Sequence, residues 1–125
     1  MIEYFKDSFV EEKVKELTIK LNLTHIDVTR LICVRSRGSK SRHVLARVHT
    51  LPRIMQEALG IQAHYFIEVI SENFDKLPET EKTKTLIHEL LHIPKSFAGG
   101  FRHHRLHVNK KAVEKMYNIY LNSKK

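Results

Sequence analysis

The stretch TLIHELLHIP, residues 85–94, constrains the fold of this chain more than any other, because two histidines and a glutamate stand among aliphatic residues. No glycine or proline interrupts helical geometry before Pro94, which disfavours that geometry in the residue preceding it. Burying a charged glutamate and two imidazoles without partners would cost free energy. The sequence therefore predicts a buried helix that ends near Ile93. It also predicts that His88, Glu89 and His92 have a functional role or binding partners.

The spacing of these three residues indicates a metal site. An α-helix advances by about 100° per residue, so His88 and His92 lie one turn apart on one face and can reach the same tetrahedral Zn²⁺. Glu89 lies on the flank of that face, within reach of a water held by the metal. This H-E-x-x-H arrangement is typical of metalloproteases, in which the glutamate takes a proton from the water. The alternative is a chance match in an ordinary helix.

A third ligand is expected downstream of the helix, because a catalytic zinc usually has three protein ligands and one open position. The flexible Ala98-Gly99-Gly100 stretch can turn the chain back and present the sequence FRHHRLH to the metal. We favour His104 as this ligand, with His103 and His107 as alternatives. Glu114, on the next expected helix, is the rival, and the residues that do not bind metal are expected on the surface.

The remaining patterns predict an α+β fold, in which a small mixed or antiparallel sheet of about three strands packs on helices. Ser8 and Glu11 form a capping box before a helix over residues 9–21. Two β-rich runs around Gly38-Ser39-Lys40-Ser41 read as a hairpin. Further elements follow in order: a short helix between Pro52 and Gly60, a strand over residues 63–71, the histidine-bearing helix after Pro78, and a last helix from Asn109.

The length of 125 residues suits a single domain, 1–125, and the sequence contains no repeat or long linker. The N-terminus lacks the apolar core of a signal peptide, and no apolar run approaches the roughly 20 residues that span a bilayer. The single cysteine, Cys33, excludes an intrachain disulfide. A cytoplasmic protein that does not span a membrane is therefore expected.

The net charge of +8 is concentrated in two zones that contain no acidic residue. The zones hold seven and five basic residues: Arg30, Arg35, Arg37, Lys40, Arg42, Arg47 and Arg53, then Lys95, Arg102, Arg105, Lys110 and Lys111. Such zones favour an acidic partner such as nucleic acid. No aromatic motif of an RNA-binding sheet accompanies them, so a solvated basic face is the simpler alternative.

The stretch from Leu51 to His104, about half of the chain, resembles a small archaeal and phage family of metallopeptidases that is itself similar to the SprT-like minimal zincins. The resemblance is carried by HELLHIP, by the glycine-rich turn, and by the arginine and histidine that follow it. It implies a minimal zincin fold, one zinc ion bound by His88, His92 and His104, and Glu89 as general base. It also implies peptide-bond hydrolysis, and SprT-like proteases often carry a basic DNA-binding region.

The working hypothesis is a zinc-dependent endopeptidase whose protein or peptide substrate pairs with an exposed strand edge. The third strand, residues 63–71, is the candidate, although the sequence alone does not identify the edge strand. Candidates to stabilise the oxyanion are Arg102, His103, His107, Tyr117 and Tyr120, although the two tyrosines fit a helix core better. Two rivals remain open at this point: a metal-dependent nuclease, and a non-catalytic zinc-containing module that binds nucleic acid or protein.

Overall fold

The computed structural model describes residues 1–102 and 107–123, which form an α+β fold as predicted. Its sheet is mixed and has four strands instead of three, in the order β1-β2-β4-β3. The strands are β1 (Glu3–Lys6), β2 (Leu31–Arg37), β3 (Ala46–Thr50) and β4 (Tyr65–Ile70). The helices are α1 (Ser8–Lys20), the short 3-10 helix η1 (Val28–Arg30), α2 (Arg53–Leu59), α3 (Ser71–Phe74), α4 (Glu79–Leu91) and α5 (Lys110–Ser123).

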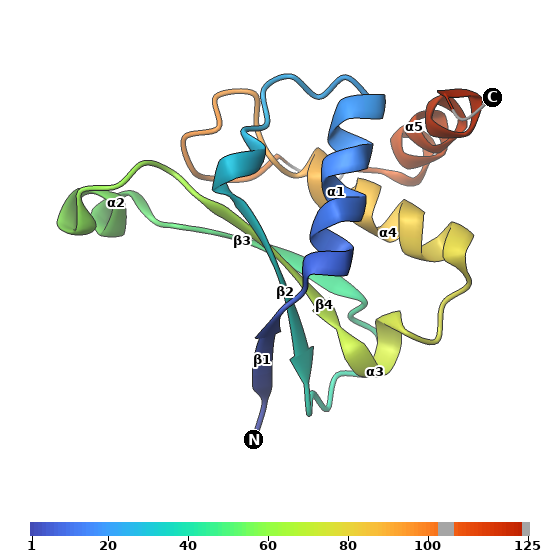
Figure 1. The fold of residues 1–125 in the computed structure, drawn as a ribbon, viewed down its shortest axis with the longest axis horizontal. Coiled ribbons are helices and arrows are strands. Elements are labelled where there is room, and N and C mark those ends of the chain that lie inside the picture. Colours follow the sequence, from blue (N-terminus) through green and yellow to red (C-terminus); the bar gives the residue numbers. More distant parts are fainter. Residues whose placement is uncertain (103–106, 124–125) are drawn as a thin grey trace.

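The core lies between one face of the sheet and the three long helices α1, α4 and α5 (Figure 1). Along β4 the side chains of Tyr65, Ile67 and Val69 point to this face and are completely buried. The alternation that predicted this strand and its buried face is thereby confirmed. Leu86, Ile87 and Leu90 of α4 complete the contact, so the histidine-bearing helix is fixed against the sheet.

The predicted hairpin is wrong, because β2 and β3 do not pair with each other. Instead β4 lies between them, parallel to β2 and antiparallel to β3. The connection from 38 to 45 passes the end of β4, where α3 holds it. Asn73 donates hydrogen bonds to the carbonyls of Ser41 and Val44 at 2.9 and 2.8 Å, and Glu72 accepts one from the backbone N–H of Gly38. These contacts favour a crossover over a tight turn.

The strand expected to offer a free edge, β4, is therefore internal and has both sides paired. The two edge strands are β1 and β3, and β3 is the one that packs beside α4. Any polypeptide that adds to the sheet near the histidines must pair with β3. This result moves the predicted substrate edge from residues 63–71 to residues 46–50.

The start of α1 also differs from the expectation. Asp7, and not Ser8, caps the helix, since its carboxylate accepts a hydrogen bond from the N–H of Val10 at 2.9 Å. The second carboxylate oxygen of Asp7 pairs with Arg35 at 2.9 Å. That ion pair ties the helix to β2, which explains why aspartate is selected over the adjacent serine.

No helix among the described residues is long and apolar enough to cross a membrane. The lone Cys33 lies in the core, where burial raises the pKa of its thiol to about 12. Cys33 is therefore a protonated, packed side chain.

Candidate metal centre

Helix α4 carries the two histidines and the glutamate on its last turns. It begins after Pro78, with Glu79 and Glu81 near its positive end, and His92 is its C-cap residue. The aliphatic side chains of its inner face lie in the core, while His88 is partly exposed and both Glu89 and His92 are buried. The helix therefore presents its polar side chains along the boundary between core and solvent.

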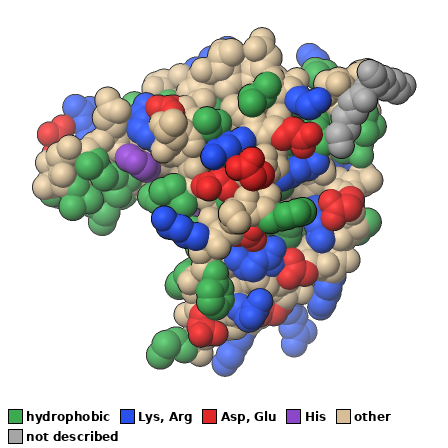
Figure 2. All heavy atoms as spheres, viewed as in Figure 1, with side chains coloured by type: hydrophobic (Ala, Val, Ile, Leu, Met, Phe, Trp, Pro, Cys, Tyr) green, Lys and Arg blue, Asp and Glu red, His purple; other side chains and the backbone are tan. Residues whose placement is uncertain are grey.

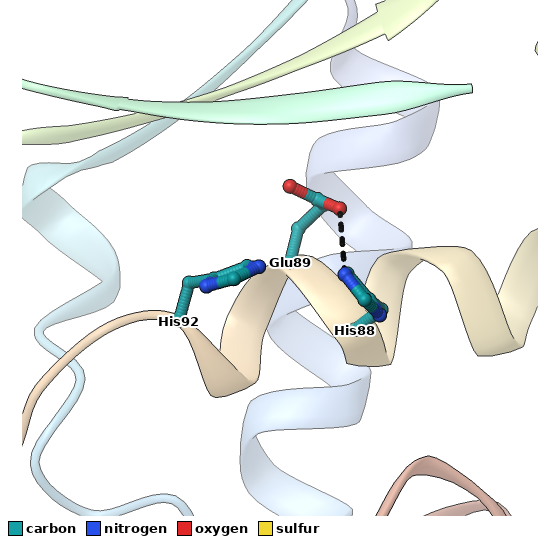
Figure 3. Close-up of side chains that lie close together, drawn as sticks. All are labelled: His88, Glu89 and His92. Carbon is teal, nitrogen blue, oxygen red and sulfur yellow. Dashed lines mark ion pairs between the residues drawn. The ribbon is translucent and has the colours of Figure 1, made fainter. Parts of the chain in front are cut away.

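The side chains of His88, Glu89 and His92 converge on one point (Figure 3). One potential ligand atom from each lies within 4.8 Å of the others. The two imidazole rings are 5.0 Å apart between centroids and 70° apart in orientation, and Nε2 of His88 is 3.9 Å from Oε2 of Glu89. Two imidazoles and a carboxylate at this separation form a donor set suited to a divalent cation such as Zn²⁺.

His92 is fixed from behind by the backbone of Arg102. The N–H of Arg102 donates to the carbonyl of His92 at 2.8 Å, and Nδ1 of the His92 ring lies 2.9 Å from the carbonyl of Arg102. Because a carbonyl only accepts, Nδ1 must carry the proton, and in the neutral ring the lone pair resides on Nε2. Metal-binding histidines commonly have their second nitrogen oriented in this way.

Tyr65 holds the glycine-rich turn that brings Arg102 to His92. Its hydroxyl accepts a hydrogen bond from the N–H of Gly99 at 3.0 Å and donates one to the carbonyl of Gly100 at 3.1 Å. Both glycines have positive φ angles, 111° and 82°, which side chains with a Cβ rarely adopt. The predicted return of the chain after Pro94 is confirmed as far as Arg102, and its anchor is a tyrosine in the central sheet.

Replacing Tyr65 with phenylalanine is expected to lower the free energy of unfolding by about 1–2 kcal/mol, because two partly buried hydrogen bonds to the glycine-rich turn are lost. The looser turn is also expected to weaken metal binding by about tenfold, the lower end of the roughly 10–100-fold range of second-shell changes. Denaturant unfolding with chelator present and competitive zinc titration measure the two effects.

Tyr117→Phe is the matched control for this substitution, because within the described residues the Tyr117 hydroxyl has one hydrogen bond, an exposed contact with Thr80 at 3.5 Å. Equal metal affinity in Tyr65→Phe and wild type would show that the turn does not support the site.

Glu89 points toward β3 and is shielded from water, with only 8% of its side chain exposed. Burial raises its pKa to about 8, an effect partly opposed by the backbone N–H of Val48 on β3. A carboxyl group with such a pKa accepts and releases a proton near neutral pH. A neighbouring divalent cation would lower this pKa by stabilising the carboxylate.

A cleft of about 640 Å³ opens over the three side chains. One wall is formed by the loop before β3 and by β3 itself, and the other by α4 with Phe101 and Arg102. A second hollow of about 550 Å³ shares Val44, Ala46, His88 and Glu89 with the first and continues toward α5. The two hollows therefore adjoin at these shared residues, beside the start of β3.

The other predicted ligands are placed less favourably or lie outside the described residues. His103 and His104 belong to the part that the structure does not describe. His107 accepts a hydrogen bond at Nδ1 from the Arg102 guanidinium at 2.7 Å, and Glu114 pairs with Lys84 at 2.8 Å. Neither joins the His88, Glu89 and His92 cluster in the described part of the chain.

The tyrosines considered for the oxyanion serve elsewhere. The hydroxyl of Tyr120 bonds Lys13 and Glu16 on α1, and Tyr117 lies under the ammonium group of Lys84. Arg102 does line the cleft. Sequence reasoning missed the hydroxyl of Tyr65, although a tyrosine in the middle of a buried strand signals that its hydroxyl needs a partner.

Comparison with known proteins gives one result. The family model described as "Putative phage metallopeptidase" matches residues 2–121, which is nearly the whole chain. No curated protein and no solved structure matches the sequence. The match confirms the phage family resemblance drawn from the sequence, while the relation to archaeal and SprT-like proteins stays a prediction.

Proposed function

The chain belongs to the phage metallopeptidase family, and from this premise we propose that it hydrolyses peptide bonds in the cleft with one Zn²⁺ held by His88, His92 and His104. The observation that carries the proposal is the orientation of His92, whose Nδ1 proton is committed to the Arg102 carbonyl so that Nε2 presents its lone pair. A minimal zincin fold is part of this proposal.

The donor chemistry of the cluster fits zinc. Imidazole nitrogens suit Zn²⁺ better than they suit Mg²⁺ or Ca²⁺, which prefer oxygen ligands. Bound there, zinc would polarise the scissile carbonyl and make a water more acidic. The aliphatic neighbours of the cluster, including Leu90 and Leu91, are buried and would keep the local dielectric low.

Glu89 has the position and the proton affinity of a general base. Its carboxylate takes a proton from the attacking water and delivers that proton to the amine that leaves. Its place on the flank of the helix, between the histidines and β3, puts it beside a substrate lying along β3. A bound cation would lower the pKa of Glu89 and keep its carboxylate ionised, so that it can accept the proton.

His104 is proposed as the third ligand on the basis of chain connectivity. Arg102 is joined to His92 by two hydrogen bonds, and His104 follows it by two residues. Two residues of chain span at most about 7 Å, so a side chain two positions after Arg102 is within reach of the cluster. His107 is less suited, because its Nδ1 already accepts a hydrogen bond from Arg102.

The substrate is proposed to be a protein or peptide that binds in extended form along the edge strand β3. Main-chain hydrogen bonds to β3 supply affinity with little demand on sequence. Nucleic-acid binding stays a secondary prediction, because three arginines of the first basic zone are engaged in ion pairs: Arg30 with Asp27, Arg35 with Asp7 and Asp75, and Arg47 with Glu68.

Removal and return of the metal test the proposal. The purified protein is expected to contain about one zinc per chain by elemental analysis and to cleave an unfolded protein substrate. A chelator should abolish the cleavage, and a stoichiometric addition of Zn²⁺ should restore it. A nuclease assay run in parallel serves as the control for the rival activity.

Cleavage that persists after the metal is removed would refute the proposal. Metal-dependent cleavage of nucleic acid without proteolysis would favour the nuclease instead.

A further inference from the structure

The segment 51–64, which connects β3 to β4 and which we name the arm, projects from the body of the protein (Figure 1). Its helix α2 contains no buried residue. Four large apolar side chains on the arm are exposed: Ile54 by 77%, Met55 by 50%, Leu59 by 64% and Ile61 by 45%. Figure 2 shows the hydrophobic side chains gathered on this projection. We name these four side chains the apolar tip.

The arm is firmly placed although its tip is uncovered. The N–H of Leu51 donates to the carbonyl of His64 at 3.1 Å, which closes the base of the arm. Gln56 donates to the carbonyls of Leu51 at 2.9 Å and Ala98 at 3.4 Å. The second of these bonds connects α2 to the glycine-rich turn beside the metal centre. The arm is therefore held in a defined position relative to the cleft.

The arm adjoins one end of the cleft. The arm begins where β3 ends, and β3 is the wall along which a polypeptide is proposed to lie. At the same end of the cleft Phe101 is 46% exposed, and its ring packs against Tyr65. A chain that continued along β3 past its last residue, Thr50, would lie beside the arm, which begins at the next residue.

We propose that the apolar tip is a secondary binding site for an apolar segment of an unfolded polypeptide substrate engaged in the cleft. This inference rests on the proposed function. A second copy of the chain fits the tip less well, because four such side chains offer about 500 Å², below the roughly 800 Å² per partner that stable interfaces bury. A substrate already held in the cleft needs only a small additional contact, since the second contact is intramolecular.

The test replaces Ile54 and Leu59 with glutamine, which is polar and keeps helix propensity. Ile19→Gln is the matched control, since Ile19 is 76% exposed on α1 and lies outside the arm. Reduced, carboxymethylated α-lactalbumin serves as the unfolded substrate. A library of six-residue peptides, each spanning about 20 Å, samples the cleft with little chain beyond it.

For the unfolded protein, the I54Q/L59Q variant is expected to have a KM about tenfold higher than the parent's and a similar kcat. For the peptides, its kcat/KM should stay close to the parent's. In the Glu89→Gln background, fluorescence anisotropy should show about tenfold weaker binding of the unfolded protein to the arm variant. Ile19→Gln should match its parent in both assays. Circular dichroism and thermal unfolding verify that α2 is retained.

Equal binding and equal KM in the parent and the arm variant would overturn the inference. If the parent were dimeric and the arm variant monomeric, the apolar tip would be the contact with a second copy of the chain. That result would also overturn the inference. If the parent cleaves neither substrate, the proposed function fails, and the anisotropy measurement still decides whether the apolar tip binds polypeptide.

Discussion

Replacing Glu89 with glutamine is expected to leave zinc bound and to reduce peptide hydrolysis by about 10³-fold or more, because the amide cannot accept the proton of the attacking water. Glutamine has nearly the same shape, and the buried position of Glu89 makes a neutral side chain no harder to accommodate. Elemental analysis of the purified variant and kcat/KM on an unfolded protein substrate measure the two parts of the result.

Glu68→Gln is the matched control for this experiment. Glu68 is also a buried carboxylate, on β4, and it does not line the cleft itself, although it pairs with His49 at 2.8 Å and with the cleft residue Arg47 at 3.7 Å. This change is expected to alter stability and to leave kcat near the wild-type value. A Glu89→Gln variant with undiminished kcat would exclude Glu89 as the base, and one that lost its zinc would assign Glu89 to metal binding instead.

Replacing His88 or His92 with alanine is expected to reduce zinc affinity by far more than the roughly 10–100-fold that second-shell changes produce. Each substitution removes one of the two described imidazoles of the cluster. His92→Ala additionally removes the donor to the Arg102 carbonyl. Competitive zinc titration gives the affinities. The variant that binds zinc more weakly should also show the lower rate of hydrolysis. His64→Ala is the control, because that imidazole bonds the carbonyl of Gln62 away from the cluster.

The same titration extended to His103→Ala, His104→Ala, His107→Ala and Glu114→Ala identifies the third ligand. His104→Ala is expected to weaken zinc binding as severely as His88→Ala, whereas the other three should remain near wild type. A loss confined to His103→Ala would shift the ligand by one residue. If none of the four variants lost zinc affinity, a third ligand from this segment or from Glu114 would be ruled out.

The local elements of the fold could be predicted from the sequence, but their arrangement in the sheet could not. Pro52 and Gly60 bracket α2 as expected, with Gly60 in the left-handed conformation, and Asn109 caps the start of α5. The order β1-β2-β4-β3 depends on contacts between distant residues, such as those of Asn73 with the connection before β3. Strand β1 was not predicted, because its four residues are all exposed and show no alternation of buried and exposed side chains.

The candidate site was predictable to the extent that helical spacing determined it. His88, Glu89 and His92 are adjacent because one helix carries all three, and the structure brings them together. The supports come from elsewhere in the chain: the backbone of Arg102, the Tyr65 hydroxyl and the edge of β3. Backbone hydrogen bonds leave no signature in residue types, so these supports required the fold.

The hydrogen bonds that orient His92 come from the backbone of Arg102, so they do not depend on which side chain stands at position 102. Arg102 orients His92 through its N–H and its carbonyl, while its side chain lines the cleft. A substitution at position 102 therefore changes what the cleft contacts and leaves both hydrogen bonds to His92 available to any residue except proline, which lacks the N–H. The side chain at this position is free to diverge while the orientation of His92 is kept.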